Sequence, residues 1–209
     1  FAEEKNKYQW YLQKNGKGLV RIAVAHHLED NGETMLFHLF RGSGIKGLAG
    51  IPAVRGKVIR PLLCVERREI ETYLRGMGQD FCTDSTNEED GYTRNRIRHH
   101  ILPYVEENIV SGCVQHMGQT AGLLAETEDY LALQTREAYG RCVTKAQADG
   151  GYTVDWGGFA QLHPAIRKRL LYELLLDLSP GAKDITAVHV TALSELLLCA
   201  GNRELQLPF

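Results

Sequence analysis

The stretch AHHLEDNGET at residues 25–34 combines histidine and carboxylate side chains at a spacing that could support catalysis. Asp30 and Glu33 are three residues apart, so on a helix they share one face. Such carboxylates can hold Mg²⁺ or a nucleophile beside a nucleotide, and His26 could donate a hydrogen bond to a phosphate oxygen. A structural interpretation stays open, because Asp30 as N-cap and Glu33 three residues later would form a capping box.

A second concentration of functional groups is YTRNRIRHH, residues 92–100, in a chain whose formal net charge is −2. On a helix Arg94 and Arg98 share a face, and Asn95 lies beside them. Arg96 lies elsewhere. The planar guanidinium fork suits phosphate, so this stretch could clamp a nucleotide or an RNA backbone. A solvated basic face paired with neighbouring acids explains the same residues.

A third basic stretch, Arg167-Lys168-Arg169, lies near the start of another helix-like segment. Arg167 and Arg169 could contact an RNA backbone, because neutralising phosphates is a major source of nucleic-acid affinity. A solvent-facing surface whose aliphatic stems lie along the protein is the alternative.

Strand-like and helix-like patterns alternate over the first hundred residues. The first part predicts a helix over 3–14, a strand over 19–25, and a helix from Asp30 that Gly42 ends. A strand over 57–63, closed by Pro61, and a helix over 65–78 follow, and the inward residues of that helix are Val65, Ile70, Tyr73 and Leu74. A third strand is predicted over 79–84, and then a helix over 94–107 that breaks or restarts at Pro103. This alternation indicates an α/β layer with a parallel sheet, whose carboxyl edge is where ligands bind.

Gly42, Gly44 and Gly47 have the G-x-G-x-x-G spacing of a dinucleotide-binding turn. That motif requires a preceding strand and a following helix. Here a predicted helix precedes it and the loop LAGIPAVRG, residues 48–56, follows, so a dinucleotide site is not expected. Gly44, Gly47 and Gly50 instead let a loop turn tightly.

The second half of the chain has a helical texture. It predicts a long helix over 113–147, a short strand over 152–156, a helix from His163-Pro164 with Ile166, Leu170, Leu171, Leu174 and Leu175 on its apolar side, a break at 179–181, and a last helix over 185–199. We therefore expect two domains: an incomplete parallel-sheet nucleotide-binding domain over 1–106, and an all-helical domain over 107–209.

The composition is that of an ordinary globular protein, with 44% hydrophobic and 24% charged residues. The five cysteines form no C-x-x-C pair, which argues against a zinc ribbon or a disulfide framework and favours reduced, buried thiols. No signal peptide and no apolar run of about 18 residues is present, so we expect no membrane span and a cytoplasmic location.

Three sequence blocks carry a family resemblance: AHHLEDNGETMLFHLFRGSGIKGLAGI, IRPLL with REIETYL, and DSTNEEDGYTRNRIRHHILP. Their order and spacing over residues 25–103 closely resemble those of the tRNA(Ile)-lysidine synthases, a family of the PP-loop (N-type) ATP pyrophosphatases. HPAIRKRLLYELL and the final LPF resemble the helical module that follows the catalytic domain there. Residues 1–18 match poorly.

The resemblance implies an adenine nucleotide alpha hydrolase-like fold and a ligase that uses ATP and Mg²⁺. Such enzymes adenylate the C2 oxygen of the wobble cytidine of tRNA(Ile) with a CAU anticodon, and free L-lysine then displaces AMP. By motif position, His26, Asp30 and Glu33 are expected to be catalytic, with Asp30 on Mg²⁺ and Glu33 helping to position lysine or metal. His26, Arg94 and Asn95 are expected near ATP. The expected nucleic-acid contacts are Arg96, Arg98, Arg167 and Arg169.

This chain also departs from the family pattern. Glu29 and Asn31 stand where Asp and Gln are common, which leaves their roles open. The S-G-G-x-D-S phosphate loop is absent, so we expect a fragment that lacks the loop upstream of Phe1, lacks a further C-terminal module, and does not turn over alone. Another PP-loop tRNA-modifying enzyme and a non-catalytic RNA-binding module remain alternatives. A homodimer is left open.

Overall fold

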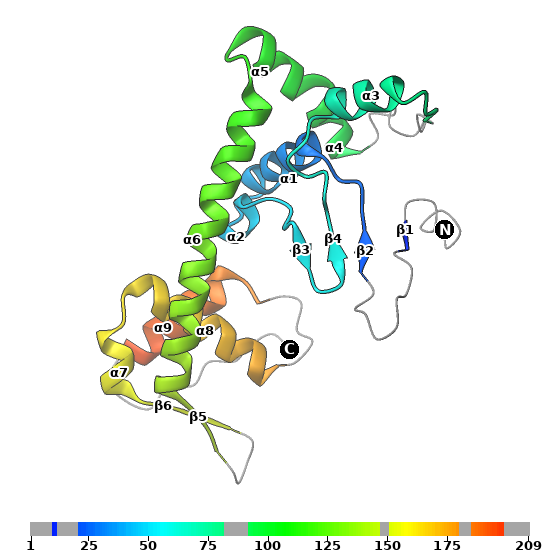
Figure 1. Ribbon diagram of the computed structural model, residues 1–209. Coiled ribbons are helices and arrows are strands. Elements are labelled where there is room, and N and C mark those ends of the chain that lie inside the picture. Colours follow the sequence, from blue (N-terminus) through cyan, green and yellow to red (C-terminus); the bar gives the residue numbers. More distant parts are fainter. Residues whose placement is uncertain (1–9, 12–20, 82–91, 147–150, 180–184, 199–209) are drawn as a thin grey trace, which may run out of the picture. The chain divides into compact units, whose positions relative to one another are not determined.

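The computed structural model describes residues 10–11, 21–81, 92–146, 151–179 and 185–198 (Figure 1). The chain divides into two compact units, Phe1–Glu128 and Asp129–Phe209. Helix α6 (Cys113–Cys142) runs through this division. The expected division of labour, nucleotide binding over 1–106 and tRNA recognition over 107–209, remains a prediction.

The first unit contains a four-stranded sheet with the order β1-β2-β4-β3. The strands are β1 (Trp10–Tyr11), β2 (Ile22–Ala23), β3 (Val54–Arg55) and β4 (Val58–Ile59). Only β2 and β4 pair in parallel, and both outer pairs are antiparallel. Among the described strands the sheet is therefore mixed, which corrects the predicted parallel sheet.

Three local predictions in this unit are wrong. Trp10–Tyr11 belong to a strand rather than to a helix over 3–14, because their backbone pairs with β2; the rest of that range lies outside the described residues. Val54–Arg55 pair with β4 across a turn at Gly56 (φ +59°), so the predicted loop contains a strand. Residues 79–81 form no strand, and 82–84 lie outside the described residues.

Helices gather at the end of the sheet where β2 and β4 finish (Figure 1). β2 leads into α1 (Leu28–Phe40), and β4 leads into α3 (Arg67–Gly76), as the alternating pattern predicted. The short α2 (Ile45–Leu48) lies between α1 and β3, inside the glycine-rich stretch. Gly42 follows the end of α1 with φ +69°, which confirms it as the helix stop.

The helical segment after residue 92 changes its winding. It consists of α4 (Thr93–Arg96), the π-helical turn η3 (Ile97–Ile101) and α5 (Leu102–Asn108). Pro103 lies in the first turn of α5, so the predicted restart at this proline is confirmed. The buried Ile97, Leu102 and Cys113 form the core here.

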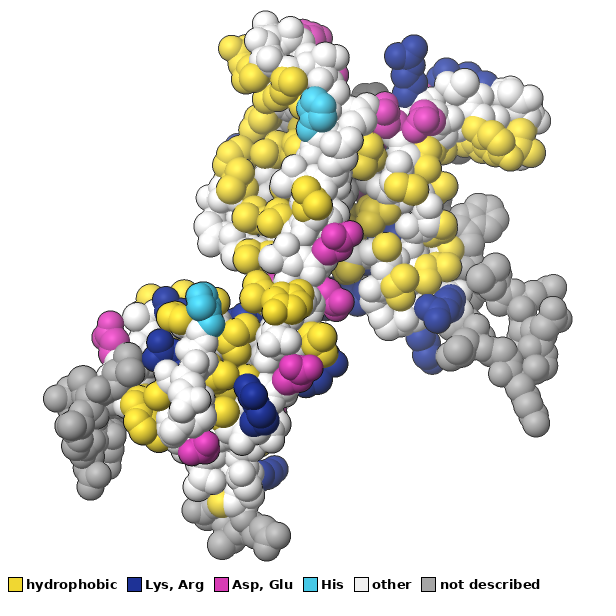
Figure 2. Space-filling model, turned by 60° about the vertical axis from the view of Figure 1, so that its left-hand side comes forward, with side chains coloured by type: hydrophobic (Ala, Val, Ile, Leu, Met, Phe, Trp, Pro, Cys, Tyr) yellow, Lys and Arg dark blue, Asp and Glu magenta, His cyan; other side chains and the backbone are white. Residues whose placement is uncertain are grey.

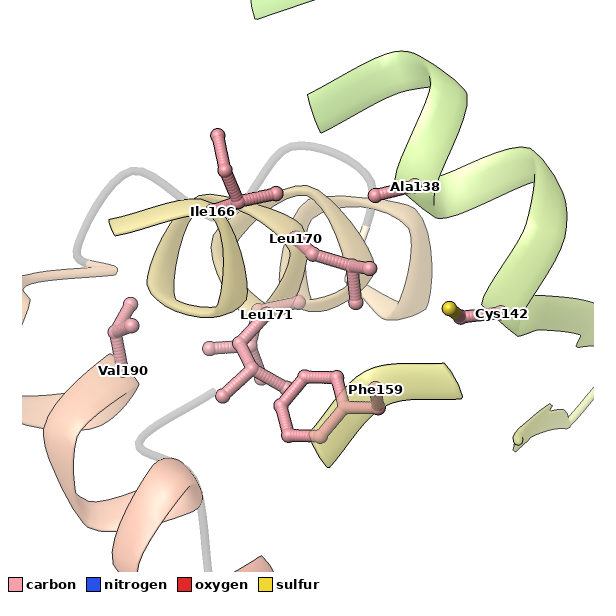
Figure 3. Close-up of a cluster of buried hydrophobic side chains, with 8 residues drawn as sticks. Ala138, Cys142, Phe159, Ile166, Leu170, Leu171 and Val190 are labelled. Atoms are coloured by element: carbon pink, nitrogen blue, oxygen red, sulfur yellow. The ribbon is translucent and has the colours of Figure 1, made fainter. Parts of the chain in front are cut away.

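The second unit is built around α8 (Pro164–Leu178), whose five predicted apolar residues are all buried. All of them except Leu174 pack in one cluster with Ala138 and Cys142 of α6, with Phe159 of α7 (Trp156–Gln161), and with Val190 of α9 (Ala187–Leu198) (Figure 3). The predicted end of the long helix is wrong, because α6 stops at Cys142 and β5 (Val143–Lys145) pairs antiparallel with β6 (Tyr152–Val154). The unit is therefore not all-helical.

Some side chains also differ from expectation. Tyr73 was placed on the inner side of α3 but is 67% exposed. Cys113 and Cys142 are buried free thiols as predicted, whereas Cys64 is exposed; Cys82 and Cys199 lie outside the described residues. Trp156 begins α7 instead of ending a strand, because the Asp155 carboxylate caps that helix.

Acidic and basic side chains are interspersed on both units over the face that Figure 2 shows. None of the helices in the described part of the chain has both the length and the apolarity of a membrane span.

Candidate functional site

The site lies where β2 gives way to α1. His26 and His27 lie between the two elements, and α1 begins at Leu28, earlier than the sequence predicted. His27 is the N-cap, and the Asp30 carboxylate accepts a hydrogen bond from the His27 backbone N–H at 2.9 Å. The predicted capping box with Asp30 as N-cap is therefore wrong: Asp30 is the N3 residue and satisfies the start of the helix from inside.

Arg98 brings the two predicted carboxylates together. Its Nε donates to Glu33 Oε1 at 2.6 Å, and its Nη2 donates to Asp30 Oδ1 at 3.1 Å and to Glu33 Oε2 at 3.2 Å. Glu33 is only 2% exposed, whereas the Asp30 side chain is 18% exposed. The shared face of Asp30 and Glu33 thus binds one guanidinium from a distant segment.

The electrostatics of this cluster favour a charged Arg98. Burial alone would lower the pKa of Arg98, but Glu33 and Asp30 outweigh it and raise that pKa. Burial raises the pKa of Glu33, and the Arg98 guanidinium opposes that rise. Arg98 was expected at a nucleic-acid backbone, but in this structure its guanidinium faces the two acids.

The π-helical turn is what presents Arg98. In η3 the Leu102 N–H bonds the Ile97 carbonyl, five residues back, and Pro103 has no N–H to donate. Ile97 is 1% exposed in the core while its neighbour Arg98 reaches the acids. Single π turns in α-helices are frequent at functional sites.

Glu29 and Asn31, whose roles the sequence left open, connect the site to its surroundings. Both Glu29 carboxylate oxygens accept from the Arg67 backbone N–H at 3.1 Å, at the start of α3, and the His27 imidazole donates to Glu29 at 2.8 Å. The Asn31 side-chain oxygen accepts from the Ile51 N–H at 2.7 Å. These two side chains hold the start of α1 against α3 and against the loop after α2.

His26 and Arg60 follow the two parallel strands. His26 Nδ1 and Arg60 Nε are buried and have no hydrogen-bond partner. Burial is the main cause that lowers the pKa of His26; Arg60 and Arg94 add to it, and Asp30 opposes it. The sequence prediction missed Arg60, although its place directly after a strand, in IRPLL, was a usable signal.

Arg94 and Asn95, predicted near ATP, line an open pocket of about 420 Å³ together with Phe37, Tyr92 and Thr93. Its aromatic and amide groups suit a nucleobase.

The remaining predicted residues belong to other elements. Arg96 is exposed at the end of α4 in the first unit. Arg167 and Arg169 are half-buried on α8 in the second unit. His163 begins that helix, where its Nδ1 accepts from the Ala165 N–H at 3.2 Å.

Comparison with known proteins shows what this chain is similar to. Residues 6–105 match the PP-loop domain. The chain is 36% identical over 190 residues to the tRNA(Ile)-lysidine synthase of Caldanaerobacter subterraneus subsp. tengcongensis, covering 90% of this chain and 40% of that protein. The enzyme of the same name from Geobacillus kaustophilus is 39% identical over 198 residues, covering 92% and 41%. That of Bacteroides thetaiotaomicron is 53% identical over 107 residues, covering 51% and 25%.

The chain thus spans less than half the length of these three relatives. Residues 6–105 are thus similar to the PP-loop domain, and most of the chain is similar to tRNA(Ile)-lysidine synthases.

Proposed function

We propose that this protein acts in lysidine formation, the ATP-dependent ligation of lysine to C2 of the wobble cytidine of tRNA(Ile). The observation that carries the proposal is the Asp30–Arg98–Glu33 cluster at the carboxyl end of β2, within a PP-loop domain. The names of the relatives supply tRNA(Ile) and the product lysidine, and L-lysine as the second substrate is part of the proposal.

The proposed reaction has two steps. The C2 oxygen of cytidine attacks the α-phosphorus of ATP, and the bond to pyrophosphate breaks. The neutral ε-amine of free L-lysine then attacks C2; the C–N bond forms, the C–O bond breaks, and AMP leaves with that oxygen. A nearby base must take up the proton that the amine loses.

Asp30 is the carboxylate that we propose to meet the substrate. Two acids share one arginine, so the cluster has a negative excess that suits the lysine ammonium group. Asp30 is partly exposed and can orient the amine and accept its proton, whereas Glu33 is buried beneath Arg98. Glu33 is therefore a positioning residue that fixes Arg98, which in turn orients Asp30.

The nucleotide is proposed to lie beside this cluster, with its phosphates near His26 and its base near Arg94 and Asn95. The described residues contain no group of three or more His, Cys, Asp or Glu that could cage a metal. One carboxylate plus substrate phosphates is an ordinary Mg²⁺ environment, so Asp30 fits as the protein ligand. Bound there, Mg²⁺ would offset phosphate charge.

The anticodon of tRNA(Ile), with sequence CAU, is the proposed nucleic-acid partner. Arg96 on the first unit and Arg167 and Arg169 on the second are the proposed backbone contacts. Arg98 is reassigned from this set to the acidic cluster.

A chimera tests the proposed function. The matched segment of the Caldanaerobacter enzyme is replaced by this chain, and transfer of labelled lysine to a tRNA(Ile) transcript is measured. We expect transfer by the chimera and a loss of about 100-fold or more in Asp30→Asn, with tRNA binding retained. Asp129→Asn, an exposed acid on α6, is the matched control. A folded chimera without lysine transfer, or full activity in Asp30→Asn, would contradict the proposal.

A further inference from the structure

Two buried side-chain nitrogen atoms in the described part of the chain lie unsatisfied at the carboxyl edge of the sheet. Among the described residues, neither His26 Nδ1 nor Arg60 Nε has a hydrogen-bond partner. Buried polar atoms are nearly always hydrogen-bonded, so each such exception requires an explanation.

Strand pairing brings these two side chains to the same place. β2 and β4 are parallel, with Ala23 opposite Ile59, and the Val24 N–H bonds the Ile59 carbonyl at 2.9 Å. Arg60 directly follows β4, and His26 follows β2 at the same edge. The two orphan atoms therefore belong to one site rather than to separate surfaces.

The Arg60 guanidinium is anchored on one side only. Its Nη1 donates to the Pro52 carbonyl at 2.7 Å, and its backbone N–H bonds the Ala53 carbonyl at 2.9 Å. The Nε of the same guanidinium takes no part in these hydrogen bonds. This leaves a fixed, planar donor group with bonding capacity to spare, which is the geometry that arginine uses to bind oxyanions.

The local charge also favours an anion. In the described part of the chain neither Arg60 nor Arg94 makes an ion pair, and both act electrostatically on His26. Asp30 is the acid that acts on His26, but its carboxylate is already bonded to Arg98 and to the His27 N–H. Two unpaired cations and a buried imidazole nitrogen remain for a ligand.

We propose that Arg60 binds an oxyanion of a substrate at this edge of the sheet, with His26 and Arg94 as its partners. The ligand chemistry is a phosphate or carboxylate group. This inference rests on the proposed function for the source of that group, which is either the phosphates of ATP or the carboxylate of lysine.

The binding test uses the whole chain and isothermal titration with three probes: inorganic pyrophosphate, L-lysine, and cadaverine, which is lysine without its carboxylate. Arg60→Gln should weaken the binding of one anion about tenfold or more. If only the affinity for pyrophosphate falls, the anion that Arg60 binds is a phosphate. If the affinity for L-lysine falls while that for cadaverine is unchanged, the anion is a carboxylate. Arg55→Gln, an exposed arginine on the same hairpin, is the matched control and should bind both anions normally.

Arg60→Lys covers the case in which Arg60→Gln fails to fold, because lysine keeps the charge but not the planar fork. The Arg60→Lys variant should also bind the anion more weakly than the unsubstituted chain does. The ¹⁵N signal of the His26 imidazole should shift when the bound anion is added, and this shift should vanish in the Arg60 variants.

Equal affinities in the folded variants and the unsubstituted chain, or no anion binding by the unsubstituted chain, would overturn the proposal. These outcomes are independent of lysine transfer by the chimera, so the failure of one proposal does not imply the failure of the other.

Discussion

Glu33 can stay charged in the interior only because Arg98 binds both of its oxygens. A carboxylate that is 2% exposed loses nearly all of its hydration, and the two hydrogen bonds from Arg98 replace it. The contact joins residues 65 positions apart. No helical periodicity could have revealed it, although the sequence placed each partner on its element.

Removing the Arg98 side chain should therefore lower the free energy of unfolding. Arg98→Met leaves Glu33 as an uncompensated buried charge, and such losses destabilise proteins by about 3–5 kcal/mol. The double variant Glu33→Met/Arg98→Met should recover a large part of this loss, because the fully buried carboxylate is removed together with its arginine and only the partly exposed Asp30 remains. Urea unfolding of Arg98→Met, of Glu33→Met and of the double variant measures both effects. Additive losses in the double variant would show that the pair does not act as a unit.

The side chain of Asn31 leaves room only for a glycine at position 50. Gly50 has φ +72°, and a Cβ built there would lie 2.1 Å from Asn31 Oδ1, the atom that accepts from the Ile51 N–H. Gly50→Ala should thus combine left-handed backbone strain with loss of this hydrogen bond, about 2 kcal/mol or more in total.

Thermal and urea unfolding of Gly50→Ala check this prediction. Gly122→Ala on α6 is the matched control, because the new Cβ would meet open space and the substitution replaces a glycine within a helix. That control should stabilise the protein by about 0.5–1 kcal/mol. A neutral Gly50→Ala would mean that Asn31 can move away freely.

At the scale of elements, the sequence predicted the helices that bury a long apolar face. The five buried residues of α8 recur at helical spacing over ten residues, so their positions could be read directly. β1 and β3 have two residues each, which is too short for alternation to be visible. Their strand conformation comes from pairing with β2 and β4, a contact that no local pattern encodes.

The start of the site helix shows the same limit in a single motif. The sequence predicted Asp30 as the start of this helix, because it precedes the apolar stripe, but His27 is the N-cap. The hydrogen bond from the His27 N–H to Asp30 decides between them. Likewise, the proline at 103 predicted a restart of the helix, but the π-helical winding before it depends on packing Ile97 into the core.

The start of α6 depends on a carboxylate from the preceding helix. Glu106 accepts from the Gly112 and Cys113 N–H groups at 2.6 and 2.9 Å. The hydrogen bond from Gly112 is the main cause that lowers the pKa of Glu106 below 4.5, and the bonds from Cys113 add to it. A lowered folded-state pKa means that this stabilisation is present above pH 4.5 and is lost as the pH falls through the folded pKa.

Glu106→Gln should therefore lower the melting temperature by a few degrees at pH 7. The difference from the unsubstituted chain should shrink as the pH falls below 4.5, because Glu106 then becomes protonated as well. Melting curves by circular dichroism across this pH range measure it. Glu107→Gln, the neighbouring exposed acid, should show no such pH dependence.

At the scale of the whole molecule, the formal net charge of −2 excludes binding of RNA through bulk charge. Any tRNA affinity must come from local arginines, and the interspersed charges in Figure 2 agree with this. Such an interface differs from a diffuse field in one measurable way: the number of phosphates contacted sets the salt dependence of binding.

We therefore expect the affinity of the chain for tRNA(Ile) to fall steeply with salt, and Arg167→Gln and Arg169→Gln each to reduce the logarithmic slope by about 1. Fluorescence anisotropy with labelled tRNA from low to physiological salt measures the slope. Arg75→Gln on α3 is the matched control, because it removes one exposed arginine that is not among the proposed tRNA contacts. If both α8 variants keep the slope of the unsubstituted chain, the R-K-R run is a solvated surface of the helix, and the contacts to tRNA must come from other residues.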